Sequence, residues 1–124
     1  MISVFISPRY LIDKDELIKK VTKILKSSDV DAALQLNIAF VGKRKMKQIA
    51  MTYKNEDVAL PVLSFPYLSA GDSQTPEFTE EKMFGEIVLC FPQAVLLAAE
   101  KNKPLDSMIL NLIEHGIRTI LHHK

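Results

Sequence analysis

The final segment of the chain, residues 105 to 124, places the strongest constraint on its fold. Apolar residues recur there at steps of three and four, at Leu105, Met108, Ile109, Leu112, Ile113, Gly116, Ile117, Ile120 and Leu121. This period predicts an amphipathic helix with one buried stripe. All three histidines (His115, His122 and His123) belong to the segment, and His115, Thr119 and His122 fall along one flank of the stripe. The segment is therefore either a packing helix with surface histidines or a helix that presents histidine ligands.

Length and composition predict one compact domain. The chain has 124 residues, 48% of them hydrophobic, which suffices for a real core. Its 16 basic and 15 acidic residues nearly cancel, so no overall charge indicates a nucleic-acid partner. The single cysteine, Cys90, cannot form an internal disulfide, and its apolar neighbours predict a buried strand position. Because the sequence shows neither a membrane-length apolar run nor a signal-like start, we expect a soluble cytoplasmic protein with no membrane partner.

Hydrophobic periodicity predicts the element order β-α-β-α-β-loop-β-α-α. The expected strands cover 2–6, 32–40, 62–65 and 85–89, and the expected helices cover 13–26, 43–53, 92–100 and 105 onward. Pro61 removes a backbone donor just before the third strand, which suits an edge strand or the start of a strand. Residues 67–82 are polar and show neither period, so we expect a surface loop. The order favours an α+β domain, a small mixed four-stranded sheet with helices packed over one face.

A cluster of cations opens the helix expected over 43–53. Lys43, Arg44, Lys45 and Lys47 crowd its first turns, where positive charge opposes the helix dipole. The arrangement does not favour the helix itself, so one interpretation is a surface that faces RNA phosphates through Lys43, Arg44 and Lys47. The alternative is an ordinary solvated helix, because a basic cluster alone is weak evidence.

Three segments match sequence patterns at fixed spacing. Residues 85–89 match G-D/E-I-x-I, and His115 and Gly116 match the start of H-G-x-L-H-L-x-G-x-D-H. Residues 53–66 match Y-R-x-x-D-x-P-T-D-V-L-S-F-P at seven positions: Tyr53, Asp57, Val62, Leu63, Ser64, Phe65 and Pro66. These patterns belong to the YbeY family of bacterial endoribonucleases of rRNA maturation, which the chain resembles best over residues 32–121.

The resemblance implies a zincin-like fold, with residues 1–124 forming one domain. It also implies a zinc ion that is held by three histidines and activates water for cleavage of single-stranded RNA. Single-stranded rRNA and the small ribosomal subunit would then be the partners, and ribosome quality control the setting. Lys54, Ser64 and His115 would line the catalytic cleft. Lys54 replaces an arginine of the family pattern and keeps the charge for RNA binding, but it loses the bidentate fork.

The histidine motif is incomplete in this sequence. Thr119 stands where the second histidine belongs, and the given sequence ends before the third. His122 lies two turns beyond His115, about 10 Å along a continuous helix, which is too far to share an ion. His122 and His123 could therefore serve as metal ligands only if the helix ends near Ile120 and the chain folds back. Two hypotheses stay open: a metal-dependent endoribonuclease, or a catalytically inactive, metal-free RNA- or ribosome-binding module in a truncated or degenerate family member.

Overall fold

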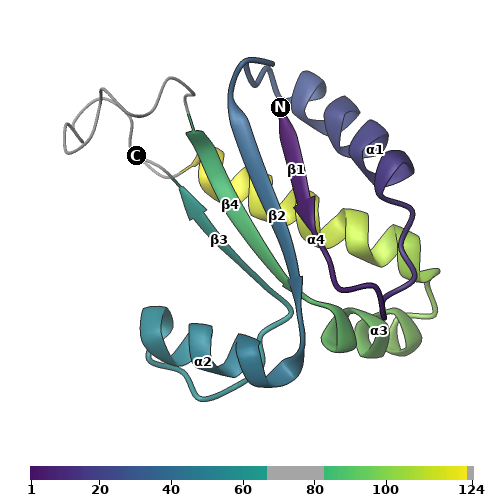
Figure 1. The fold of residues 1–124 in the computed structure, drawn as a ribbon, viewed down its shortest axis with the longest axis vertical. Helices are drawn as coiled ribbons and strands as arrows, with labels where there is room; N and C mark the ends of the chain where they lie inside the picture. The colour runs from purple at the N-terminus through teal and green to yellow at the C-terminus, as the bar shows by residue number, and fades with distance from the viewer. Residues whose placement is uncertain (67–82, 123–124) are drawn as a thin grey trace.

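A four-stranded mixed sheet forms the centre of the computed structural model, which describes residues 1–66 and 83–122 (Figure 1). The strands follow the order β1-β2-β4-β3 across the sheet. Three of them run parallel, and the edge strand β3 runs antiparallel to β4. Their bounds are β1 (Ile2–Phe5), β2 (Gln35–Val41), β3 (Val62–Pro66) and β4 (Met83–Cys90). The prediction of a mixed four-stranded sheet is confirmed, and Pro61 directly precedes a strand that is also an edge strand.

Four helices complete the order β1-α1-β2-α2-β3-β4-α3-α4. They are α1 (Lys14–Ser27), α2 (Lys43–Lys54), α3 (Phe91–Glu100) and α4 (Leu105–Leu121). The predicted order of helices and strands is confirmed, whereas the loop expected over 67–82 lies outside the described residues. No helix in the described part of the chain has the length and apolar character that crossing a membrane requires.

Local sequence signals explain where α1 and β2 begin. The Asp13 carboxylate caps α1 by accepting a hydrogen bond from the Glu16 amide (3.2 Å), which satisfies a donor that the first helical turn leaves free. The strand expected from residue 32 begins later, at Gln35. Asp31 causes the delay, because its carboxylate accepts from the Ala33 amide (2.9 Å) and its carbonyl oxygen accepts from the Leu34 amide (3.0 Å). These bonds form a turn across the first three expected strand residues.

Helices cover both faces of the sheet, which corrects the expectation of one covered face. Side chains alternate along a strand, so β4 contributes to two separate cores. Ile87 and Leu89 join the larger core, which packs against α1 and α4. Val88 and Cys90 join a smaller core on the other face, where α2 supplies Met46. Periodicity predicted a buried stripe on each helix but did not determine which face of the sheet each stripe covers.

Helix α4 approaches β4 closely because glycines stand at two contact points. At Gly116 an added Cβ would lie 3.0 Å from Ile87 Cδ1. At Gly85 it would lie 2.6 Å from Ile120 Cδ1 and 2.9 Å from the carbonyl oxygen of Phe65. Real Cβ atoms do not come as close to other atoms as these two distances at Gly85. The sheet and α4 therefore pack at a separation that only a residue without a side chain allows. This contact fixes the rotation of α4 and therefore the direction of its exposed flank.

Candidate functional site

The exposed flank of α4 carries a shallow hollow, here called the α4 hollow, lined by His115, Arg118, Thr119 and His122. All four residues are exposed, whereas the neighbouring Gly116 is buried against the sheet. Arg118 also forms an ion pair with Glu114 one turn earlier (3.2 Å). An exposed pair of this kind adds little stability, and the guanidinium lines the same hollow as the two imidazoles. The helix thus brings His115 and His122 to one surface, as the periodicity predicted.

Thr119 uses its hydroxyl within the helix. The Oγ1 atom donates a hydrogen bond to the carbonyl oxygen of His115 (3.0 Å), a common pattern for threonine inside a helix. A neutral hydroxyl is already a poor ligand for zinc compared with imidazole. Thr119 therefore does not act as a substitute for the second histidine of the motif.

The helix continues through Leu121 without folding back. The amide of His122 still donates to the carbonyl oxygen of Arg118 (3.0 Å). His115 and His122 therefore stand two turns apart, about 10 Å along the axis, and His123 lies outside the described residues. In residues 1–66 and 83–122 no three side chains of the ligand types His, Cys, Asp and Glu gather as a metal site. The described residues thus do not fit the three-histidine zinc site that the resemblance implies.

Ser64 and Lys54 lie on opposite sides of the sheet edge. Ser64 pairs with Ile87 across the β3–β4 ladder, and alternation turns both side chains toward α4. Lys54 ends α2 on the other face, where the neighbouring Tyr53 ring contacts Phe65 of β3 (5.1 Å between centroids, 67° between planes). The common catalytic cleft predicted for Lys54, Ser64 and His115 stays a prediction.

The basic residues of α2 lie together but far from the α4 hollow. Lys43, Arg44 and Lys47 line one broad, shallow depression. They follow the end of β2, whereas Ile120 of α4 packs near the start of the parallel strand β4. Five residues of strand, about 16 Å, separate these ends, and Figure 1 shows α2 below the sheet and the last turns of α4 behind its upper end. The cations therefore form a second surface.

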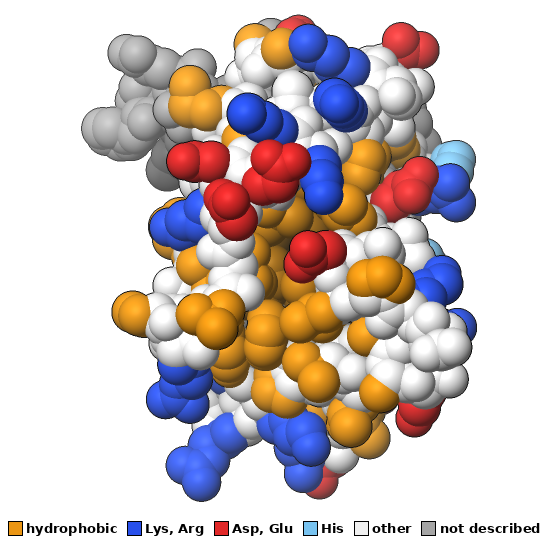
Figure 2. Space-filling model, turned by 90° about the vertical axis from the view of Figure 1, so that its right-hand side faces the viewer, with side chains coloured by type: hydrophobic (Ala, Val, Ile, Leu, Met, Phe, Trp, Pro, Cys, Tyr) orange, Lys and Arg blue, Asp and Glu red, His pale blue; other side chains and the backbone are white. Residues whose placement is uncertain are grey.

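A third, apolar hollow lies between α1 and the start of α4, on the face shown in Figure 2. Ile12, Leu17, Ile109 and Leu110 line it, and the acidic residues at its rim are Asp13, Glu16 and Asp106. All three acids stand at the start of a helix, where negative charge is favourable. Because carboxylates repel phosphate, this hollow is not a candidate for RNA binding.

Comparison with known proteins identifies the family. The sequence model of the YbeY family, described as "Endoribonuclease YbeY", matches residues 7–123. The chain belongs to the YbeY family. The Endoribonuclease YbeY of Cupriavidus necator is 37% identical over 87 residues, which cover 70% of this chain and 39% of that protein. The Endoribonuclease YbeY of Dehalococcoides mccartyi is 29% identical over 136 aligned residues, which cover 99% of this chain and 78% of that protein.

A solved structure supports the fold at low sequence identity. The solution structure of a protein from Thermotoga maritima superposes with a TM-score of 0.66 at 22% identity, and the match covers all of this chain and 74% of that one. The α+β fold expected from the YbeY resemblance is confirmed. The matched stretch spans about two fifths of the Cupriavidus protein.

Sequence reasoning missed two features of the candidate site in this YbeY-family chain. Neither the hydrophobic period nor the motif matches indicated Arg118, yet this residue lines the α4 hollow. A Glu114–Arg118 spacing of four residues was the available signal, since such pairs meet on a helix surface. The second feature is the contact between Gly85 and Ile120. No local pattern indicates it, because the two residues lie far apart in the sequence.

Cys90 is fully buried, and its chemistry is separate from the α4 hollow. Burial raises the pKa of the thiol, and a backbone hydrogen bond from Gln93 and the charge of Lys43 offset part of this effect. The folded protein therefore keeps the thiol proton at a pH where the unfolded chain releases it. Because unfolding then releases a proton, stability is present below the ordinary thiol pKa, about 8.5, and falls as pH rises above it.

We expect the free energy of unfolding to decrease from pH 7.5 to pH 10 more in the wild type than in Cys90→Ala. The difference between the two proteins isolates the thiol from lysine and tyrosine titration. Urea unfolding under reducing conditions at both pH values measures it. An equal decrease in both proteins would show that the Cys90 thiol titrates alike in the folded and unfolded chain.

Proposed function

We propose that this chain acts on single-stranded rRNA at the small ribosomal subunit, in the cytoplasm, as an RNA-directed member of the YbeY family. The sequence supports this proposal, because residues 7–123 match the sequence model described as "Endoribonuclease YbeY". The observation that carries the proposal is the α4 hollow, where the Arg118 guanidinium lies beside two exposed imidazoles. Arginine binds phosphate through two parallel hydrogen bonds, and imidazole N–H groups add further donors.

Cleavage of the bound RNA is the first form of this proposal. In the family the expected cofactor is zinc, which supplies an activated water when three protein ligands leave one position open. Among the described residues His115 is the single histidine in motif position. A zinc-dependent reaction in this chain therefore requires further ligands, and the described residues support phosphate binding and orientation only.

Binding without cleavage is the second form, as a metal-free RNA- or ribosome-binding module. The hydrogen bond from Thr119 Oγ1 to the His115 carbonyl oxygen favours this second form. Thr119 occupies the position of the second histidine, and its hydroxyl binds the helix backbone. The exposed cation and imidazoles do not depend on a metal for binding phosphate. Between the two forms, the described geometry gives more support to this one.

We expect Arg118→Ala to weaken binding of a single-stranded RNA oligonucleotide about ten-fold. A hydrogen bond to a charged group contributes about 1.5–3 kcal/mol, and the exposure of Arg118 places the effect at the lower end. Asn111→Ala, at an exposed position of the same helix outside the hollow, is the matched control. Fluorescence anisotropy with a labelled oligonucleotide measures both affinities. Equal affinities in the two variants would contradict a role for the α4 hollow.

Metal content and cleavage separate the two forms of the proposal. Tag-free protein is analysed for zinc, and the same preparation is incubated with end-labelled single-stranded RNA. About one zinc per chain together with cleavage, both lost in His115→Ala, would establish the nuclease form. RNA binding with neither zinc nor cleavage would establish the binding module. Wild-type protein that binds neither RNA nor the small ribosomal subunit would reject both forms.

A further inference from the structure

The charges of α2 are arranged against the stability of the helix. Its first turn contains no acidic residue, and its N-cap Gly42 makes no side-chain hydrogen bond. Lys43 and Arg44 stand in this first turn, where the helix dipole disfavours cations. Helix α1 shows the opposite arrangement, with Asp13 as its cap, acids in its first turn and a lysine in its last. Helix stability therefore explains the last-turn lysines, Lys26 of α1 and Lys54 of α2, but not the cations at the start of α2.

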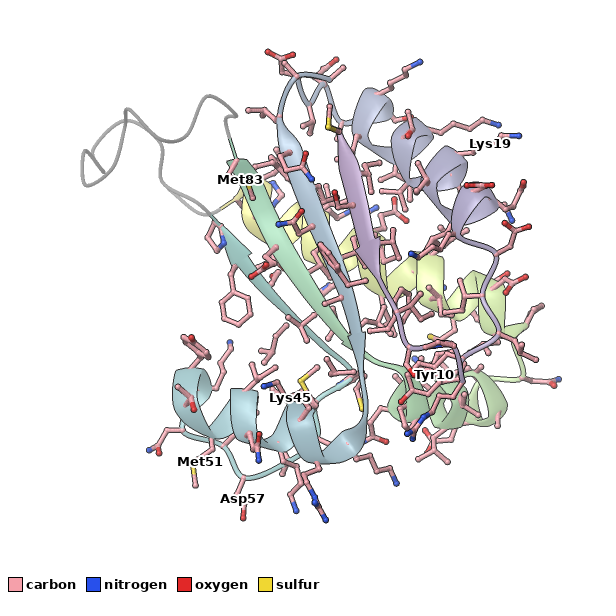
Figure 3. All side chains as sticks on the ribbon, viewed as in Figure 1. Tyr10, Lys19, Lys45, Met51, Asp57 and Met83 are labelled. Atoms are coloured by element: carbon pink, nitrogen blue, oxygen red, sulfur yellow. The ribbon has the colours of Figure 1, made fainter. Side chains whose placement is uncertain are left out.

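The α2 cations form a ridge. Lys43, Lys47 and Lys54 follow one another at steps of four and seven residues, which keeps them within about 40° of rotation around the helix. The ridge is about 16 Å long. Arg44 joins Lys43 and Lys47 in lining the depression on the solvent side, where Figure 3 shows Met51 pointing away from the sheet. Among the described residues the ion pair found is Arg118–Glu114, so the ridge cations form no ion pair there. Asp57 is the one carboxylate among the described residues that line the depression, against three cations.

An exposed aromatic ring stands at the end of the α2 ridge. Tyr53 precedes Lys54 in the chain and is 67% exposed. One edge contact, with the ring of Phe65, holds its ring in place. Phe65 belongs to β3, the edge strand of the sheet. Cations that follow a phosphate backbone, together with an aromatic side chain on which a base stacks, are the features that bind single-stranded nucleic acid.

We infer that the α2 ridge is a track for single-stranded RNA, distinct from the α4 hollow. The RNA backbone follows Lys43, Arg44, Lys47 and Lys54, and one base stacks on Tyr53. The strand then passes the β3 edge to the other face of the sheet. The α4 hollow lies on that face, so one RNA contacts both surfaces around the same edge. This inference rests on the proposed function, since it assigns a second contact for the same RNA.

A salt titration of RNA binding tests the ridge. The ridge variant carries Lys43→Gln, Arg44→Gln and Lys47→Gln. The control variant carries Lys19→Gln, Lys23→Gln and Lys26→Gln, which remove the same charge from exposed positions of α1. For a labelled oligouridine of about 12 nucleotides, each phosphate contact contributes about 0.7 to the slope of log K against log salt. We expect the ridge variant to lose about 2 units of slope and at least about ten-fold in affinity, and the control to keep both.

Two further measurements examine the fold and the stacking. The melting temperature of the ridge variant is expected to equal or exceed that of the wild type, because the substitutions remove charges that oppose the helix dipole. Tyr53→Leu is expected to weaken binding about five-fold or more, whereas Tyr53→Phe retains the stacking ring and the affinity. A ridge variant that melts at the wild-type temperature and binds RNA more weakly supports the track.

The outcomes separate this inference from the proposed function. Wild-type protein that binds no RNA contradicts the proposed function and, with it, the track. Wild-type binding that the ridge variant retains overturns the track alone. Equal losses in the ridge and control variants would show that net charge is responsible, which also overturns it. Loss of binding to phosphatidylserine vesicles with RNA binding intact would assign the ridge to an anionic membrane surface instead.

Discussion

Gly85→Ala is expected to lower the free energy of unfolding by about 1–3 kcal/mol, the usual cost of overpacking a core. The new Cβ would lie 2.9 Å from the carbonyl oxygen of Phe65, which belongs to the sheet backbone and cannot move cheaply. It would also lie 2.6 Å from Ile120 Cδ1, so α4 must shift outward. Thermal and urea unfolding measure the loss.

Two companion variants locate the effect. Gly42→Ala is the control, because its Cβ would meet only Tyr10 Oη at 3.4 Å, an ordinary contact. Gly42 is the N-cap of α2, so the substitution is expected to cost about 0.5–1 kcal/mol. Ile120→Val removes the methyl group nearest the new Cβ. In a double-mutant cycle it should recover part of the Gly85→Ala loss, since the two sites are in contact. Strict additivity of the two substitutions would contradict the contact between Gly85 and Ile120.

Thr119→His is expected to raise zinc affinity and yet to leave it about a thousand-fold weaker than nanomolar. The substitution places two histidines at positions i and i+4 of α4, a spacing that allows both to bind one zinc ion. A tight site requires at least three protein ligands, and residue 122 remains too far along the helix. Competition with a chelator measures the affinity. The difference between micromolar and nanomolar binding corresponds to about 4 kcal/mol.

The double variant that combines His115→Ala with Thr119→His is the control for zinc binding elsewhere in the chain. Adding His115→Ala to Thr119→His should remove the gain, because a single histidine is left in motif position. A nanomolar affinity in the Thr119→His variant alone would mean that another ligand completes the site. In that case our description of the α4 hollow as lacking a third ligand would be wrong.

Neither of the two proposed RNA contacts depends on a metal ion. Arg118 presents its charge on one face of the sheet, and the α2 ridge lies on the other, with the edge strand β3 between them. A polyanion that contacts both gains affinity from each contact, and its binding should therefore depend steeply on salt. This arrangement fits a chain whose net charge is only +1, because the cations are concentrated locally.

The sequence by itself determined the secondary structure and the family. Each helix shows its own period, and Asp13, Gly42 and Pro61 mark element starts through local backbone chemistry. The buried state of Cys90 and the exposed flank of α4 followed from the same patterns. These features depend on residues within a few positions of one another, so short-range reasoning was sufficient for them. Only the turn formed by Asp31 shifted a boundary by several residues.

The tertiary structure alone decided how the candidate residues are distributed. It placed α2 and α4 on opposite faces, so that the predicted RNA-binding residues Lys43, Arg44 and Lys47 lie far from His115. It also brought Gly85 against Ile120, which sets the rotation of α4. The hydrophobic period of a helix or strand indicates which of its faces is buried. It does not indicate which other helix or strand covers that face. That pairing depends on strand order and long-range packing, and these emerge only when the whole chain folds.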